Sequence, residues 1–367
     1  MFLEKLQLLN FRNLANQKLE FKNSINVIYG DNAQGKTNLI EAIYLLSGSR
    51  SMRAKTDHEL IAWGKEKAKI SGKADFLDLE LTVFPNQKKL LINKQEKRLT
   101  DLIGTFLTVL FTPAEVEIAS GSPDRRRRFL DQFAANLSRE YLVSLGKYQK
   151  VLRARNGLLW QIKNGRAHDL SVWDEQLATL AVEIWKKRVS LIEELNTEIK
   201  TVSRKLLSGD LKLFYEPPIA VGSTKNMREE FLRLLQKSSS EEIRKALTQI
   251  GPQRDDFKII LDLEKNDKIV SKDLGIYGSR GEQRSAVICL KLAEIELLTA
   301  AKETRPTLLL DEVLGELDPK HQQLLVRQIR KGQAFLTSAN YTELKKILGT
   351  GYKSFEVKDG AITPVAD

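Results

Sequence analysis

The segment that most constrains the fold of this chain is Gly30-Asp31-Asn32-Ala33-Gln34-Gly35-Lys36-Thr37, which matches the pattern G-x-x-x-x-G-K-[ST]. It lies between an apolar run at residues 24–29, which predicts a strand, and helical spacing of apolar residues at 37–46. Glycines here let backbone N–H groups surround a phosphate, while Lys36 reaches the β- and γ-phosphates and Thr37 offers its hydroxyl to Mg²⁺. A chance match in a glycine turn is the alternative. The flanking strand and helix favour an α/β fold that binds ATP and Mg²⁺.

A second apolar strand, predicted at residues 307–310, ends in two carboxylates, Asp311 and Glu312. Asp311 is a candidate ligand of Mg²⁺ through water, and Glu312 could orient or deprotonate an attacking water. Many strands end in acids, so the pattern is weak by itself. Together with a phosphate loop far upstream, it predicts a catalytic site made of Lys36, Asp311 and Glu312.

A Ser-x-Gly-x-Gln turn at residues 279–283 precedes a strong helical pattern at 285–300. Such a turn at a helix N-terminus can bind an anion, although alone it would indicate an ordinary helix cap. Ser279 lies 28 residues before Thr307, which leaves room for one helix before the acidic strand. We therefore predict that Ser279, Gly281 and Gln283 contact the nucleotide. The same prediction extends to Asp318, just after the acidic strand, where a simple helix start is the alternative.

A long helical segment occupies the middle of the chain. Residues 122–207 carry helical periodicity with one weak point at 164–169. The two arms, 138–163 and 170–207, would be about 40 and 57 Å long, so we expect a projecting antiparallel hairpin. After it we expect, in order, a linker at 208–223, short helices at 226–237 and 240–248, and paired strands at 257–263 and 268–270.

The helical segment is also the most basic part of the chain. The formal net charge is +11, and residues 125–206 hold 17 basic and 9 acidic residues. This excess favours a polyanionic partner, although a solvated charged helix face is equally compatible. Four successive arginines, Arg125, Arg126, Arg127 and Arg128, oppose the dipole of the helix they begin. They are therefore candidate contacts for DNA phosphates or for an acidic protein surface.

Composition excludes several kinds of protein and site. No run approaches 18 apolar residues, which excludes a membrane-spanning helix and, with it, a membrane role. The one cysteine, Cys289, excludes a disulfide framework and a cysteine zinc site. His58, His168 and His321 are too few and too scattered for a metal cluster. The expected compartment is the cytoplasm.

In their order along the chain, these motifs resemble the ATP-binding-cassette architecture. The opening Leu9-Asn10-Phe11-Arg12-Asn13-Leu14 narrows the resemblance to chromosome-maintenance and recombination ATPases, in which the arginine matching Arg12 lies near the bound phosphates. Thr37 and Ser279 are 242 residues apart, more than in a transporter cassette and far fewer than in a long chromosomal coiled coil. Residues 113–131 and Gly251-Pro252-Gln253-Arg254-Asp255-Asp256 are similar to the bacterial recombination mediators of the RecF family.

This resemblance implies an ABC-type ATPase head, a mixed sheet with helices, formed by residues 1–112 and 250–367. Residues 113–249 would form an inserted all-helical lobe with an antiparallel helical hairpin. The implied function is weak, DNA-stimulated ATP hydrolysis by a protein of recombinational repair and replication restart at gapped DNA. The implied partners are double-stranded and single-stranded DNA and mediator proteins of the RecO and RecR type. ATP would join two copies, one chain's phosphate loop facing the other chain's Ser279 turn, and hydrolysis would release them.

Two departures from the cassette pattern suggest slow hydrolysis. The strand predicted at 334–337 ends in Thr337-Ser338-Ala339 where cassette ATPases usually have a histidine, and Thr337 or Ser338 is the candidate substitute. Residues 107–117 hold no glutamine where the pattern places one. A non-hydrolysing structural clamp and a transport-type ATPase subunit remain alternatives. Glu312 argues against the clamp, and the long helical insertion and the missing histidine argue against the transporter.

Overall fold

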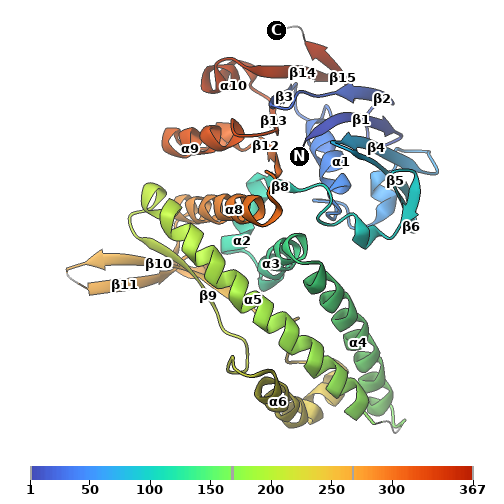
Figure 1. The fold of residues 1–367 in the computed structure, drawn as a ribbon, viewed down its shortest axis with the longest axis vertical. Coiled ribbons are helices and arrows are strands. Elements are labelled where there is room, and N and C mark those ends of the chain that lie inside the picture. The colour runs from blue at the N-terminus through green and yellow to red at the C-terminus, as the bar shows by residue number, and fades with distance from the viewer. Residues whose placement is uncertain (1, 167–168, 267, 366–367) are drawn as a thin grey trace. The chain divides into compact units, whose positions relative to one another are not determined.

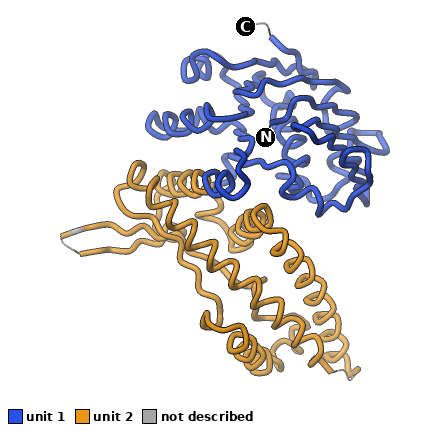
Figure 2. The backbone as a smooth tube through the Cα atoms, in the orientation of Figure 1, with its two compact units in different colours: residues 1–115, 294–367 blue, residues 116–293 orange. Residues whose placement is uncertain are grey.

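The computed structural model describes residues 2–166, 169–266 and 268–365, and the chain divides into two compact units (Figures 1 and 2). Unit 1 consists of Met1–Glu115 and Glu294–Asp367, and unit 2 of Val116–Ala293. Residues 250–293, which the sequence patterns grouped with the phosphate loop, cluster with unit 2, because β10 (Phe257–Lys265) pairs with β9 (Asp210–Tyr215). His168 lies outside the described residues.

The first sheet of unit 1 has six strands in the order β15-β14-β3-β13-β12-β8. Its strands are β3 (Ile25–Tyr29), β8 (Thr108–Phe111), β12 (Thr307–Asp311), β13 (Ala334–Ser338), β14 (Tyr352–Lys358) and β15 (Ala361–Val365). All pairs are parallel except that of β14 with β15. The carboxyl ends of β3, β12 and β13 therefore meet at one edge, where Asp311 pairs with Thr337 and Tyr29 with Ser338.

The second sheet of unit 1 is antiparallel and has the order β2-β1-β4-β5-β6-β7. Its strands are β1 (Leu3–Leu9), β2 (Gln17–Glu20), β4 (Ala68–Ala74), β5 (Leu77–Phe84), β6 (Gln87–Ile92) and β7 (Gln95–Lys97). Helix α1 (Lys36–Leu46) contacts β12 and β13 of the first sheet and β4 and β5 of the second. Burial between two sheets explains why α1 is apolar almost all round, and it fixes the residues at its N-terminus. The unit also contains helices α9 (Pro319–Ile329) and α10 (Tyr341–Leu348), short 3₁₀ turns and the last part of α8 (Arg280–Lys302), from Glu294 onward.

Unit 2 contains the predicted helical hairpin. Helices α4 (Arg139–Lys163) and α5 (Ser171–Leu206) run antiparallel, and Arg155 Nε of α4 binds Asp174 Oδ1 of α5 at 2.6 Å (Figure 1). The other helices of the unit are α2 (Glu117–Ser120), α3 (Pro123–Leu137), α6 (Thr224–Lys245), α7 (Leu274–Tyr277) and the first part of α8 (Arg280–Lys302). The unit also contains a three-stranded sheet in the order β11-β10-β9, in which β11 is Lys268–Asp273. Within the described ranges no helix is long and apolar enough to cross a bilayer.

Two elements of unit 2 differ from the sequence prediction. The expected linker at 208–223 contains strand β9, in which Leu211 and Leu213 alternate inward and are buried. Glycines and prolines on either side of this strand dominate the local pattern and conceal the alternation. The two short helices expected at 226–248 are one helix, α6, because the serines at 238–240 do not interrupt it.

A buried charged network joins the helices of unit 2 to residues 251–256. Arg188 of α5 is 1% exposed and binds Asp131 Oδ1 of α3 at 2.7 Å. Its other nitrogens donate to Pro252 O at 2.8 Å and to Tyr141 Oη at 3.1 Å, and lie 3.4 Å from Asp255 Oδ2. One guanidinium thus holds three segments that are distant in the sequence.

Replacing Arg188 with leucine is expected to reduce the free energy of unfolding by about 3–5 kcal/mol, because it leaves buried acidic groups unpaired. Urea unfolding followed by circular dichroism measures the loss. Arg204→Leu on the same helix is the matched control, since its pair with Asp210 is exposed and should change stability little. Equal effects of the two substitutions would contradict a structural role for the buried network.

Candidate nucleotide-binding site

The phosphate loop joins β3 to α1 through two backbone positions that require glycine. Gly30 has φ 151°, and a Cβ there would lie 2.3 Å from the carbonyl oxygen of Val357. Gly35 has φ 118°, and a Cβ would lie 2.6 Å from Leu14 Cδ2. Gly35 is also the N-cap of α1 and supplies no side-chain hydrogen bond to the helix. The first N–H groups of α1 are therefore available to an anion.

Lys36 is held at the centre of the loop. It is 4% exposed, and its Nζ donates to the carbonyl oxygens of Gly30 at 2.8 Å and Asp31 at 3.0 Å. The same ammonium forms an ion pair with Glu312 Oε1 at 3.1 Å. The residue expected to bind phosphate thus contacts the residue expected to activate water.

Asp311, at the end of β12, is joined to two hydroxyl groups. Thr37 Oγ1 donates to Asp311 Oδ1 at 3.0 Å, and Thr337 Oγ1 donates to the same oxygen at 2.7 Å. Burial raises the pKa of the Asp311 carboxyl, and the hydrogen bonds from Thr337 and Thr37 act in the opposite direction. A buried carboxylate in this position is suited to a cation.

Glu312 stands in a left-handed conformation, with φ 55°, immediately after the strand. Its backbone N–H donates to Thr337 Oγ1 at 2.9 Å, and its side chain is 41% exposed. Thr337 therefore bridges Asp311 and Glu312 at the position where the cassette pattern has a histidine. Ser338, the other candidate substitute, instead donates to the carbonyl oxygen of Asn340 at 3.1 Å.

The rest of the loop is exposed or is tied to neighbouring segments. Asp31, Asn32 and Ala33 are exposed, and Gln34 Oε1 accepts a hydrogen bond from the Asp359 backbone at 2.5 Å. Ala33 adopts a left-handed φ of 65°.

Arg12 lies beside α1, where it is engaged by a buried carboxylate. Its Nε and one terminal nitrogen donate to the two oxygens of Glu41 at 2.9 and 3.0 Å, and Glu41 is fully buried. The neighbouring Asn13 donates to the carbonyl oxygen of Ala33 at 3.3 Å. The segment therefore supports the loop through Asn13, while the guanidinium of Arg12 is paired within the protein.

Arg53, in the segment after α1, is a candidate that the sequence patterns did not indicate. Its guanidinium donates to Asn38 Oδ1 at 2.5 Å. Burial raises the pKa of Asp311, and the charge of Arg53 is among the influences that oppose this rise. Arg53 is thus a cation whose charge acts on Asp311. No motif marked it, because it stands in an irregular segment.

The Ser279 turn lies in unit 2, and Ser279 and Gly281 are exposed. Ser279 Oγ accepts from the Glu282 backbone at 3.3 Å, and Ser279 N donates to Glu282 Oε2 at 2.7 Å. Lys272 Nζ donates to both oxygens of Glu282, at 2.9 and 2.8 Å, which with the Ser279 backbone lowers the pKa of Glu282 to about 2. Gln283 is buried and donates to the carbonyl oxygen of Leu274 at 2.8 Å. The turn therefore presents Ser279 and Gly281 on a firmly capped helix, with Gln283 turned inward.

Asp318 caps α9, in agreement with the simpler alternative for this residue. Its Oδ1 accepts from the backbones of Lys320 at 3.0 Å and His321 at 3.1 Å. Burial alone would raise the pKa of Asp318, but the hydrogen bonds from His321 and Lys320 outweigh it and lower the pKa. No described contact joins Asp318 to the phosphate loop.

The arginines at the start of α3 are mostly paired within unit 2. Arg126 makes two bonds to Asp256, at 2.7 and 2.8 Å. Arg127 donates to the carbonyl oxygen of Asp255 at 2.5 Å, and Arg125 pairs with Glu117 at 2.9 Å. Arg128 is exposed, and among the described residues it has no hydrogen bond or ion pair. Most of these arginines therefore already have acidic or carbonyl partners within the same chain.

Comparison with known proteins gives a consistent result over the whole length. The family described as the RecF/RecN/SMC N-terminal domain matches residues 2–362. A DNA replication and repair protein RecF of Clostridium perfringens is 35% identical over 368 residues, covering 99% of both chains. One of Alkaliphilus oremlandii is 35% identical over 373 residues, covering 99% of this chain and all of the relative.

Solved structures extend the comparison to the fold. A structure of the recombination mediator protein RecF with ATP superposes with a TM-score of 0.91 at 33% identity, covering 100% of this chain and 98% of the other. A chromosomal Smc head bound to a winged-helix domain superposes with a TM-score of 0.56 at 16% identity, covering 100% and 98% of the two chains. The second likeness concerns the fold alone, and both agree with the predicted ABC-type ATPase head.

Proposed function

Because the chain belongs to the RecF family of the RecF/RecN/SMC class, we propose that it is an ATP-dependent DNA-binding protein of recombinational repair. It would act in the cytoplasm at gapped DNA during replication restart, beside mediator proteins of the RecO and RecR type. ATP would close a homodimer, and slow hydrolysis would open it. The observation that carries the proposal is the cluster in unit 1 that joins Lys36 to Glu312 and Asp311 to Thr37 and Thr337.

The same cluster fits Mg²⁺, which Thr37 and Asp311 would hold. Asp311 is buried, and its described hydrogen bonds both use Oδ1, which leaves Oδ2 for a cation. A hydroxyl and a carboxylate are hard oxygen donors of the kind that Mg²⁺ prefers. When bound, the ion would neutralise charge on the β- and γ-phosphates.

ATP hydrolysis would depend on a change of partners around Lys36. In the structure Glu312 neutralises the ammonium of Lys36 at 3.1 Å. Phosphate oxygens carry more charge and would replace the carboxylate, which releases Glu312 to accept a proton from water. The hydroxyl of Thr337 already forms hydrogen bonds with Asp311 and with the Glu312 backbone. It would therefore contact the γ-phosphate less well than the histidine of cassette ATPases does. This supports slow turnover.

A second copy of the chain would complete the site with its Ser279 turn. Ser279 and Gly281 are exposed at the N-terminus of a 23-residue helix, where backbone N–H groups and the dipole favour an anion. The γ-phosphate distinguishes ATP from ADP, so ATP alone should favour the dimer.

DNA would be bound by the basic surface of unit 2 in both its double-stranded and single-stranded forms. Arg128 supports this most directly because it is exposed and unpaired among the described residues. Arg125, 48% exposed, could exchange Glu117 for a phosphate, whereas Arg126 and Arg127 would act mainly by fixing the helix.

Sedimentation of the chain with ATP or ADP, with and without gapped DNA, tests the proposal. We expect a dimer with ATP and a larger complex with DNA, together with ATP turnover that DNA accelerates. Turnover would exclude a non-hydrolysing clamp, and acceleration by DNA would exclude a transport-type subunit. A monomer under every condition would contradict the switch.

Replacing Ser279 with arginine is expected to block dimerisation while ATP affinity stays nearly unchanged. The phosphate loop and Asp311 are untouched, but a bulky side chain would occupy the place of the partner's γ-phosphate. ATP turnover should fall too, and DNA binding should weaken, because two basic surfaces hold DNA better than one. Sedimentation with ATP beside a nucleotide titration measures both effects.

The matched control for this variant is Ser223→Arg. Ser223 caps α6 through the same kind of hydrogen bond, to the Asn226 backbone at 3.3 Å, so its replacement removes a cap and adds the same bulk. It should leave dimerisation intact. If Ser279→Arg still dimerises with ATP, Ser279 is only a helix cap.

A further inference from the structure

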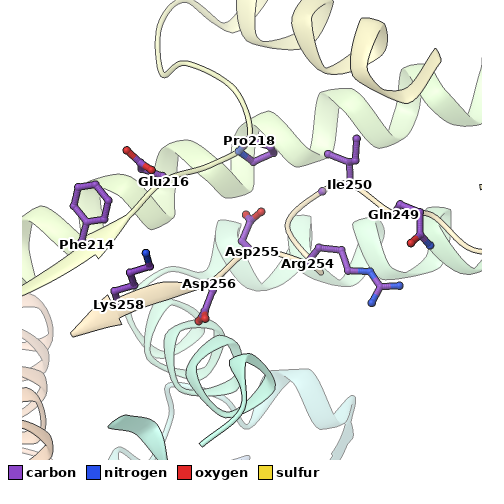
Figure 3. A pocket seen from close by; sticks show the side chains of 10 residues that line it. Phe214, Glu216, Pro218, Gln249, Ile250, Arg254, Asp255, Asp256 and Lys258 are labelled. Atoms are coloured by element: carbon purple, nitrogen blue, oxygen red, sulfur yellow. The ribbon is translucent and has the colours of Figure 1, made fainter. Parts of the chain in front are cut away.

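A cavity of about 420 Å³ lies in unit 2, and none of the nucleotide-site residues lines it (Figure 3). Its volume is within the range of sites that hold a small ligand or a few side chains. Phe214 of β9 and Lys258 of β10 stand opposite each other in the paired strands at one end. Gln249 and Arg254 lie at the other end.

The backbone of residues 251–256, along the cavity, is held by buried contacts. Gly251 has φ 135°, and a Cβ there would lie 2.5 Å from Tyr148 Oη. Asp255 Oδ2 accepts from Trp185 Nε1 at 2.6 Å and from Tyr215 Oη at 2.7 Å. Asp256 binds Arg126 through both oxygens. The two aspartates that line the cavity are therefore fixed and neutralised by the protein itself.

The remaining charged side chains of the cavity are mainly basic. Arg254 and Lys258 are exposed, and among the described residues neither side chain has a hydrogen bond or an ion pair. Glu216 is the acidic lining residue that no described contact neutralises. The fixed segment 251–256 and the adjoining strand β10 thus present two cations, Arg254 and Lys258, to the cavity.

The cavity is also partly apolar. Phe214 is 50% exposed, and Pro218 and Ile250 line the same space. A nucleic-acid backbone would gain little from these apolar side chains. A peptide that carries an apolar side chain next to carboxylates would match both the apolar wall and the two cations.

From this combination we propose that the cavity is a docking site for an acidic peptide segment of a partner protein. Its aromatic or aliphatic side chain enters between Phe214 and Ile250, and its carboxylates pair with Arg254 and Lys258. The site is separate from the nucleotide cluster and goes beyond the ATP switch. Docking therefore needs no nucleotide.

Fluorescence anisotropy of the full chain with a labelled hexapeptide, Asp-Glu-Phe-Asp-Glu-Leu, tests the site in the absence of ATP. We expect saturable binding that weakens with salt. Arg254→Ala and Lys258→Ala should each weaken it about five-fold, the effect of one partly exposed charge pair. Arg153→Ala, which removes an exposed arginine of α4, is the matched control and should have no effect.

The same assay tests whether the apolar wall of the cavity binds the apolar side chain of the peptide. Phe214→Ser should weaken binding about ten-fold. Ile269→Ser should not, because Ile269 is 74% exposed on β11, at the opposite edge of the same three-stranded sheet. A peptide with Asn and Gln in place of the acids should bind poorly. Because ATP is absent, the Lys36→Ala variant should bind the peptide as the parent does, which separates this proposal from the nucleotide switch.

Three outcomes would overturn the proposal: no binding of the peptide, equal binding of the neutral peptide, or equal effects of Arg254→Ala and Arg153→Ala. If the double variant Arg254→Ala/Lys258→Ala instead loses affinity for duplex DNA while the peptide does not bind, the cavity is a nucleic-acid contact and the proposal is wrong.

Discussion

Replacing Lys36 with alanine is expected to weaken ATP binding about a hundred-fold and to abolish ATP-dependent dimerisation. Lys36 is the only side chain in the loop with a positive charge, and its Nζ already lies 2.8 Å from the Gly30 carbonyl and 3.0 Å from that of Asp31. Losing one well-placed, charge-assisted contact to phosphate corresponds to about 3 kcal/mol. Because the dimer requires the γ-phosphate of bound ATP, the second copy of the chain would not bind.

A nucleotide titration and sedimentation with ATP measure the two effects of this variant. Lys36→Met preserves the buried aliphatic stem, so it shows whether lost packing contributes. Lys18→Ala removes an exposed lysine of β2 and should change neither property. Unaltered ATP affinity in Lys36→Ala would refute the assignment of the loop.

The elements that could be predicted from the sequence are those set by local spacing. The phosphate loop, the acidic strand and the helical hairpin each need only residues close in the chain, and the structure has all three. Strand β9 was not predicted, because Leu211 and Leu213 are buried through tertiary contacts of the strand. These contacts are with the preceding helix α5 and with β10, which lies much later in the chain. Tertiary burial outweighed the glycines and prolines around it.

The pairing of charges could not be predicted in the same way. Four adjacent arginines indicated an anionic partner, and for Arg126 that partner is Asp256, 130 residues away. Arg12 likewise pairs with Glu41, inside a helix that the sequence showed only as apolar. Because ion pairs of this kind join segments without regard to sequence distance, composition reveals an excess of charge but not how much of it faces solvent.

The contacts within the nucleotide-binding site could not be predicted from the sequence either. Lys36 and Glu312 were each assigned a role from a motif, but their contact at 3.1 Å appears only in the fold. That contact neutralises the Lys36 ammonium, which would be costly to bury without a partner. Because of this contact, Glu312 should affect two measurable properties, the affinity for ATP and the rate of its hydrolysis.

Replacing Glu312 with glutamine is therefore expected to change these properties in different directions. Turnover should fall about 10²–10⁴-fold, because the isosteric amide cannot accept the proton of water. ATP affinity should be kept or increased, because Lys36 no longer pairs with a carboxylate that competes with phosphate. The ATP-bound dimer should then persist, and it should remain on DNA for longer than the parent does.

Single-turnover hydrolysis, a nucleotide titration and dissociation from gapped DNA measure the three effects. Glu303→Gln is the matched control, because Glu303 also has a left-handed φ, 51°. It shows whether exchanging Glu for Gln at a left-handed backbone position has an effect of its own. Hydrolysis at the normal rate would show that Glu312 is not the catalytic carboxylate. Weaker ATP binding with lost turnover would instead mean that Glu312 supports the loop through its contact with Lys36, and the carboxylate would be structural rather than catalytic.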